Sequence, residues 1–192
     1  MEGYVPDESG RICTKFTFKP STGRFASEGP NVQNQPKRGR FAKKYRSMFM
    51  ASPGHYLLEI DFSSIEALIG GYLAKDADLI KAAKNSIHAI LASYALVDMG
   101  EWREPISLSW PQPQIAEAVA LIKNKWAKLY AQCKAVSYLS IYGGTPQRML
   151  YENPDVFRSI AEAKRLQETL FNTLGRSIRT WQEATLKLAA EQ

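Results

Sequence analysis

The sequence has 192 residues, enough for one large domain or for a domain with a subdomain. It is 45% hydrophobic and 23% charged, as is usual for a globular protein, and no apolar run approaches the roughly 20 residues of a membrane span, which excludes an integral membrane protein. The net charge is +6. The chain has two histidines and two cysteines, and because neither Cys13 nor Cys133 has the spacing of zinc ligands, a zinc finger is excluded. We expect the two cysteines to be reduced, packed thiols of an intracellular protein.

The first predicted element is a strand at residues 11–18, because apolar and polar side chains alternate there. A long loop follows, since residues 19–40 carry Pro, Gly, Ser and Asn throughout and show no period. The loop leads into the run KRGRFAKKYR, residues 37–46, which holds six Lys or Arg and no acid. This basic run is either a solvated charged surface or a contact for a phosphate backbone.

A second strand is predicted at residues 56–62, YLLEIDF, where side chains again alternate between two faces. Ser63 or Ser64 is expected to cap the helix that follows, because a serine hydroxyl accepts a hydrogen bond from a free N–H of the first turn. Glu66 falls in that first turn, where the helix macrodipole favours an acid.

The rest of the chain has the periodicity of helices. One helix is predicted at residues 77–97, and a long amphipathic helix is predicted from Gln114. Asn153 is expected to cap the last strong helix, which Gly175 interrupts. The predicted fold class is therefore α+β, mostly helical, with a small sheet whose strands come early.

Asp61 lies near the end of the second predicted strand, just before a helix. A carboxylate in this position is a common ligand of Mg²⁺, which prefers hard oxygen atoms and keeps waters and substrate phosphates in the rest of its shell. The main-chain carbonyl of Phe62 could add a further oxygen. The alternative interpretation is that Asp61 only caps a strand–helix junction.

Three side chains at helical spacing form a second candidate site. Lys134, Tyr138 and Tyr142 fall four residues apart, so they share one face, and Tyr130 extends the same line. A lysine among tyrosines suits a nucleotide, since the ammonium binds phosphates and the rings contact the base or sugar. The alternative is an aromatic face covered by another element.

Polar side chains also cluster in the long loop. Arg24 follows a glycine, and Asn31, Gln33 and Asn34 come just before the basic run. Amide side chains donate to phosphate and sugar oxygens and contact base edges, so this cluster is a candidate nucleic-acid contact. An ordinary Asn- and Gln-rich turn is the alternative.

Several of these segments together resemble the polymerase motifs of family A DNA polymerases, the bacterial DNA polymerase I type. The resemblance covers roughly residues 10 to 190, and the segments that carry it occur in the family's order: TGRFASEGPNVQNQP, IDFSSIEALIGGYLAKDADLI, IHAILASYAL and KAVSYLSIYGG. It implies a partial polymerase palm containing the small antiparallel sheet, followed by the helices of the fingers.

The resemblance also implies roles for individual residues. Asp61 matches the catalytic motif A aspartate that binds both Mg²⁺ ions, and Phe62 matches the residue that lends its carbonyl. Glu66 matches the glutamate that crowds the 2′ position of the sugar and so excludes ribonucleotides. His88 and Lys134, the latter in motif B, match ligands of the incoming nucleotide's phosphates.

The remaining matches concern the sugar, the template and the DNA. Tyr138 matches the ring against the sugar, Tyr142 the tyrosine that stacks at the templating position, and Gly143 the glycine after it. The residues implied to bind the DNA are Arg24, Asn31, Gln33, Asn34, Arg38 and Gly143.

The sequence also departs from the family. Tyr130 stands where the family usually has Arg, Ser64 where it has Gln, and Leu68 where it has Arg. The second metal-binding carboxylate of the family belongs to a His-Asp-Glu hairpin, motif C, which these 192 residues do not contain. The second ion's site is therefore expected to be incomplete in this chain.

Two functions follow as hypotheses. In the first, the chain is part of a DNA-directed DNA polymerase that uses dNTPs and primer–template DNA, is inactive alone, and depends on a second polypeptide for motif C and the thumb. In the second, it is a non-catalytic, nucleic-acid- or nucleotide-binding remnant. Both imply a cytoplasmic protein, with a partial palm at residues 1–75 and fingers at residues 76–192.

Overall fold

A computed structural model describes residues 4–21, 23–36 and 40–191. The chain forms two compact units, Met1–Ile60 and Asp61–Gln192. The predicted division after residue 75 separates polymerase subdomains, which compactness does not test, and it stays a prediction. Within the described ranges, no helix combines the length and the apolar character needed to cross a bilayer.

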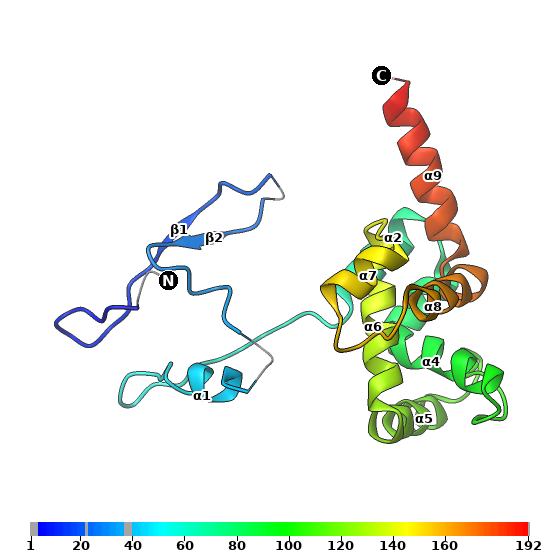
Figure 1. Ribbon diagram of the computed structural model, residues 1–192, viewed down its shortest axis with the longest axis horizontal. Coiled ribbons are helices and arrows are strands. Elements are labelled where there is room, and N and C mark those ends of the chain that lie inside the picture. Colours follow the sequence, from blue (N-terminus) through cyan, green and yellow to red (C-terminus); the bar gives the residue numbers. More distant parts are fainter. Residues whose placement is uncertain (1–3, 22, 37–39, 192) are drawn as a thin grey trace. The chain divides into compact units, whose positions relative to one another are not determined.

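The first unit contains a two-stranded antiparallel sheet. Strand β1 (Lys15–Thr17) pairs with strand β2 (Ala26–Glu28), and Phe16 lies opposite Ser27 (Figure 1). The predicted strand at residues 11–18 therefore forms only in part. A short helix, α1 (Ala42–Arg46), follows the loop and contains three of the basic residues of the run.

The prediction of a second strand is wrong. Residues 56–62 are irregular, with Leu58 83% and Ile60 82% exposed. A strand needs a neighbour to pair its N–H and C=O groups, and β1 and β2 form the only sheet in the described part of the chain. The segment has the alternating side-chain pattern of a strand, but no neighbouring strand in the described part of the chain forms backbone hydrogen bonds with it.

The second unit consists of helices, which confirms the mostly helical fold class. They are α2 (Ile65–Leu73), α3 (Ala77–Lys84), α4 (Ile87–Asp98), α5 (Gln112–Lys125), α6 (Ala127–Ile141), α7 (Pro146–Glu152), α8 (Ile160–Thr173) and α9 (Arg176–Ala190). Figure 1 shows the last turns of α9 extending beyond the other helices of this unit.

Two of the predicted helices are each divided in two. The helix predicted at residues 77–97 breaks at Asn85, whose side chain donates to the carbonyl of Lys81, and at Ser86, which has a left-handed φ of +70°. The long helix breaks at Trp126, where φ is −122° and ψ is 46°. Each break changes the direction of the chain and so decides what the next helix faces.

Two predicted helix caps also differ. Ser64 has a left-handed φ of +53° and makes no side-chain cap bond to α2. Asn153 ends α7 instead of starting the next helix. Helix α8 begins at Ile160, where the Ser159 hydroxyl accepts a 3.2 Å hydrogen bond from the N–H of Glu162.

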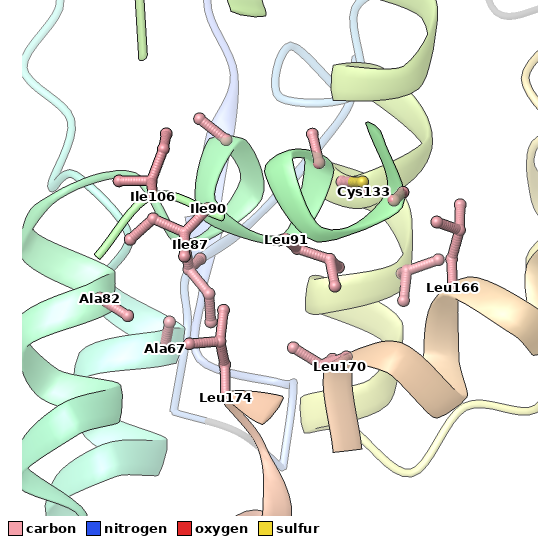
Figure 2. Packing of buried hydrophobic residues seen from close by; sticks show 14 of the residues in the cluster. Ala67, Ala82, Ile87, Ile90, Leu91, Ile106, Cys133, Leu166, Leu170 and Leu174 are labelled. Carbon is pink, nitrogen blue, oxygen red and sulfur yellow. The ribbon is translucent and has the colours of Figure 1, made fainter. Parts of the chain in front are cut away.

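The hydrophobic core of the second unit is centred on α4, which is buried on nearly every side. Ile90 and Leu91 are fully buried and pack with residues of α6 and α8, such as Cys133 and Leu166 (Figure 2). Cys133 is thus a packed thiol as predicted, and burial raises its pKa. The prediction for Cys13 is wrong, because that side chain is exposed.

Candidate nucleotide-binding site

A pocket of about 490 Å³ opens in the second unit where the starts of α2 and α4 approach α5 and α6. Its lining includes most of the residues predicted to bind the nucleotide, together with several that were not predicted. The charged and aromatic side chains of the lining are Asp61, Phe62, Lys84, His88, Lys123, Tyr130, Lys134 and Tyr138. A pocket of this size is within the range of small-molecule sites.

One face of α6 forms a wall of the pocket. Tyr130, Lys134 and Tyr138 follow one another at four-residue spacing, so their side chains project in one direction. The ammonium of Lys134 lies 5.8 Å from the centroid of the Tyr138 ring, within the range of a cation–π contact. Three residues of the stripe predicted from the sequence, Tyr130, Lys134 and Tyr138, therefore line the pocket, and Tyr130 also packs against the core.

Tyr142 and Gly143 do not join this wall. Helix α6 ends at Ile141, and the side chain of Tyr142 is 63% exposed. Both residues instead line a separate cavity beside α8 and α9. The structure thus separates these two predicted residues from the pocket.

His88 lines the pocket from the first turn of α4. It is 6% exposed, its ring centroid is 5.4 Å from that of Tyr138 and 5.9 Å from that of Tyr130, and its Nδ1 has no hydrogen-bond partner in the described part of the protein. Burial, followed by the charges of Lys134 and Lys123, lowers the pKa of His88 to about 4. The imidazole is therefore neutral at pH 7, and its unpartnered Nδ1 is itself buried.

The electrostatic balance of the pocket favours an anion. Among the described residues that line it, Lys84, Lys123 and Lys134 are basic and only Asp61 is acidic. Glu66 lies in the first turn of α2 and does not belong to the pocket lining. It is nevertheless close to the pocket, since its negative charge acts on Tyr138. Burial raises the pKa of Tyr138 most, followed by the charge of Glu66 and then by that of Asp61.

The donor set fits one Mg²⁺ ion better than two. Asp61 and Phe62 both line the pocket, and Mg²⁺ commonly binds one or two carboxylates and completes its shell with phosphates and waters. A two-ion centre needs bridging carboxylates from more than one segment. No group of three or more His, Cys, Asp or Glu side chains suited to a metal occurs in the described ranges, so these residues do not fit a two-ion centre.

The predicted DNA-contacting residues other than Gly143 belong to the first unit. The side-chain oxygen of Asn31 accepts hydrogen bonds of 3.0 Å from the N–H groups of Gln33 and Asn34, so Asn31 stabilises its own turn. The side chains of Gln33, Asn34 and Arg24 are exposed. Arg38 lies outside the described residues.

The sequence reasoning missed part of the lining. Lys123, which precedes Tyr130 by seven residues, and Lys84, at the end of α3, both line the pocket. Neither belongs to a recognised motif or to the stripe of α6. The helix breaks at Ser86 and Trp126, which the sequence pattern did not reveal, determine which residues of these helices meet the pocket.

Comparison with known proteins identifies the class. The family model of DNA polymerase family A matches residues 1–100, and the chain belongs to this family. The resemblance found in the sequence is thereby confirmed.

Individual relatives agree with this assignment. DNA polymerase I of Rhizobium leguminosarum is 38% identical over 96 residues, which is 48% of this chain and 9% of that protein. DNA polymerase I B, chloroplastic/mitochondrial, of Arabidopsis thaliana is 29% identical over 194 residues, which is 98% of this chain and 18% of that protein. The chain thus spans less than a fifth of the length of these relatives.

A solved structure is similar over nearly the whole chain. The POL domain of Pol1 from M. smegmatis, in complex with DNA primer-template and dNTP, superposes with a TM-score of 0.65 at 27% identity. The match covers 96% of this chain and 29% of that one. The helical unit and the small sheet therefore have the fold of part of a polymerase domain.

Proposed function

We propose that this chain is the part of a DNA-directed DNA polymerase that binds the incoming deoxynucleoside triphosphate. The observation that carries the proposal is the meeting of Asp61, His88, Lys134 and Tyr138 in one pocket whose charge favours an anion. Family membership supports it, because polymerisation requires such a site.

In this proposal each side chain acts on a different part of the nucleotide. Lys134 binds phosphates as a point charge, and neutral His88 forms a hydrogen bond to a phosphate oxygen. The ring of Tyr138 contacts the sugar, and Glu66, close to that ring, crowds the 2′ position. Together they fix the triphosphate in one orientation before reaction.

The palm and fingers assignment gives the remaining residues their roles. Tyr142 stacks at the templating position outside the pocket, and Gly143, which follows it, contacts the DNA. The exposed loop of the first unit contacts primer–template DNA through the predicted residues Arg24, Asn31, Gln33, Asn34 and Arg38. A cytoplasmic location remains a prediction.

The metal chemistry of the reaction needs more than this pocket. Asp61 and the Phe62 carbonyl would hold Mg²⁺, which in this class of reaction neutralises phosphate charge and lowers the pKa of the attacking hydroxyl. We propose that the further carboxylates come from motif C, in another polypeptide or another part of a longer polymerase. The chain alone then binds substrate without polymerising it.

A lysine substitution tests the proposed site. Lys134→Met is expected to weaken the binding of dATP with Mg²⁺ about 10- to 100-fold, because one charge-assisted hydrogen bond contributes roughly 1.5–3 kcal/mol. Isothermal titration calorimetry measures the affinity. Lys128→Met is the matched control, since Lys128 is an exposed lysine of the same helix that does not line the pocket. Equal losses in the two variants would refute a phosphate site at Lys134.

The alternative function is a nucleic-acid- or nucleotide-binding protein without catalysis. The single carboxylate in the pocket lining favours it, as do Tyr130, Ser64 and Leu68 at positions where the family has other residues. In its nucleotide-binding form the alternative requires the same site and differs from the first function in whether Asp61 takes part in a reaction; in its nucleic-acid-binding form it does not require the pocket.

A further inference from the structure

We propose that Lys123 is a second phosphate-binding cation of this pocket, and that it holds the polyphosphate of the nucleotide together with Lys134. The proposal rests on the proposed function, because it assigns a further residue to the same site. Lys123 belongs to α5, whereas Lys134 belongs to α6, so the two ammonium groups reach the pocket from different helices.

The break at Trp126 brings Lys123 to the pocket. Figure 1 shows α5 and α6 meeting at an angle there. Lys123 lies in the last turn of α5, and its ammonium is 5.5 Å from the centroid of the Tyr130 ring on α6. The Lys134 ammonium lies over the Tyr138 ring, and the rings of Tyr130 and Tyr138 both neighbour the ring of His88, so the two cations contact rings that meet at the same imidazole.

The cation–π contact orients Lys123 without neutralising it. A ring face attracts an ammonium group but leaves its full charge available to a phosphate. None of the ion pairs formed within the described ranges includes Lys123 or Lys134. A purely structural role, as a cation at the C-terminal end of α5, would not require Lys123 to line the pocket.

Lys123 and Lys134 line the same pocket as His88, and their charges act on its ring. After burial, the positive charges of Lys134 and then of Lys123 lower the pKa of the imidazole. Two ammonium groups that form no ion pair with the described residues therefore line the same pocket as this buried ring. A polyphosphate, which carries several negative charges in a row, is the part of a nucleotide that can contact both.

Lys125 provides a matched control for Lys123. It belongs to the same last turn of α5 and also lies over an aromatic ring, with its ammonium 4.4 Å from the centroid of Trp126. Unlike Lys123, it does not line the pocket. Substitution of either lysine removes one charge and one cation–π contact, but only one of them changes the pocket.

The experiment compares Lys123→Met, Lys125→Met and Lys123→Arg by calorimetric titration with dATP, dAMP and inorganic tripolyphosphate in the presence of Mg²⁺. Lys123→Met is expected to weaken dATP and tripolyphosphate binding about tenfold and dAMP binding much less. Lys125→Met is expected to bind like the unchanged chain, and Lys123→Arg to retain most of the affinity, because it keeps the charge. Circular dichroism shows whether each variant is folded.

The two proposals fail in different ways. If Lys134→Met weakens dATP binding and Lys123→Met binds like Lys125→Met, the inference about Lys123 is wrong and the nucleotide site stands. If Lys123→Arg loses as much as a folded Lys123→Met, the charge is not what matters and the inference is again wrong. If the unchanged chain binds neither dATP nor tripolyphosphate, the proposed function itself fails.

Discussion

The helical unit is expected to lose about 3 kcal/mol of unfolding free energy through His88 alone as the pH falls from 6.5 to 4. Burial and two lysines lower the pKa of His88 from 6.5 to about 4. Between these pH values His88 is protonated in the unfolded chain and neutral in the folded chain, so acid favours unfolding. Each pH unit of this window contributes about 1.4 kcal/mol. The stabilisation is complete above pH 6.5 and lost as the pH falls towards 4.

Urea unfolding followed by tryptophan fluorescence measures this effect. All four tryptophans, Trp102, Trp110, Trp126 and Trp181, belong to the helical unit, so their emission reports on that unit. The variant His88→Gln should lose much of the pH dependence in this window. His55→Gln should keep it, because His55 is exposed and lies in the other unit. An identical pH profile for the His88 variant and the unchanged chain would contradict the account of a neutral, buried imidazole.

Primer extension by the purified chain alone is expected to stay at the background level. The pocket lining offers one carboxylate, Asp61, and a two-ion reaction needs carboxylates from more than one segment. The expected difference from an active polymerase is many orders of magnitude, because phosphoryl transfer is extremely slow without such catalysis.

The assay uses a labelled primer–template, dNTPs and Mg²⁺, with Asp61→Ala as the matched control. Since a trace of host polymerase would extend the primer in both preparations, only extension that Asp61→Ala removes counts as activity of this chain. Such Asp61-dependent extension would show that the described residues suffice for catalysis. The proposed need for carboxylates from outside this sequence would then be wrong.

The sequence predicted best those features that depend on local spacing. Lys134 and Tyr138 share a face because they lie four residues apart in a helix. Glu66 lies in the first turn of α2, as expected from the change of pattern just before it, where the strand-like alternation ends. Ser159, rather than Asn153, caps α8, and the sequence contains the relevant pattern, a serine followed three residues later by Glu162.

Features that depend on distant residues were not predictable in the same way. The segment at residues 56–62 has the alternation of a strand, yet a strand exists only when a neighbour pairs with it. The sequence pattern predicts continuous helices through Ser86 and Trp126, whereas the backbone leaves the helical conformation at both residues. Tertiary packing, which the pattern does not contain, determines whether such a helix continues or breaks. Lys123 was missed for this reason, because its place in the pocket depends on the break.

The expectation that Asp61, His88 and Lys134 belong to one site came from the family resemblance and not from their spacing. The three residues lie 27 and 46 positions apart, so no helix or strand period relates them. The structure brings all three into one pocket lining, whereas it places Tyr142, four residues after Tyr138, outside it. The end of α6 at Ile141 explains the difference, because the four-residue stripe stops where the helix stops.

Binding of a triphosphate at His88 is the central claim, and the two imidazoles of the chain test it directly. In a nuclear magnetic resonance titration at pH 6, dATP with Mg²⁺ is expected to shift the ring signals of His88 and to raise its pKa, because phosphate charge offsets that of Lys134 and Lys123. The signals of His55, in the other unit, are expected to stay in place. Unchanged His88 signals at a dATP concentration that saturates binding would contradict the claim.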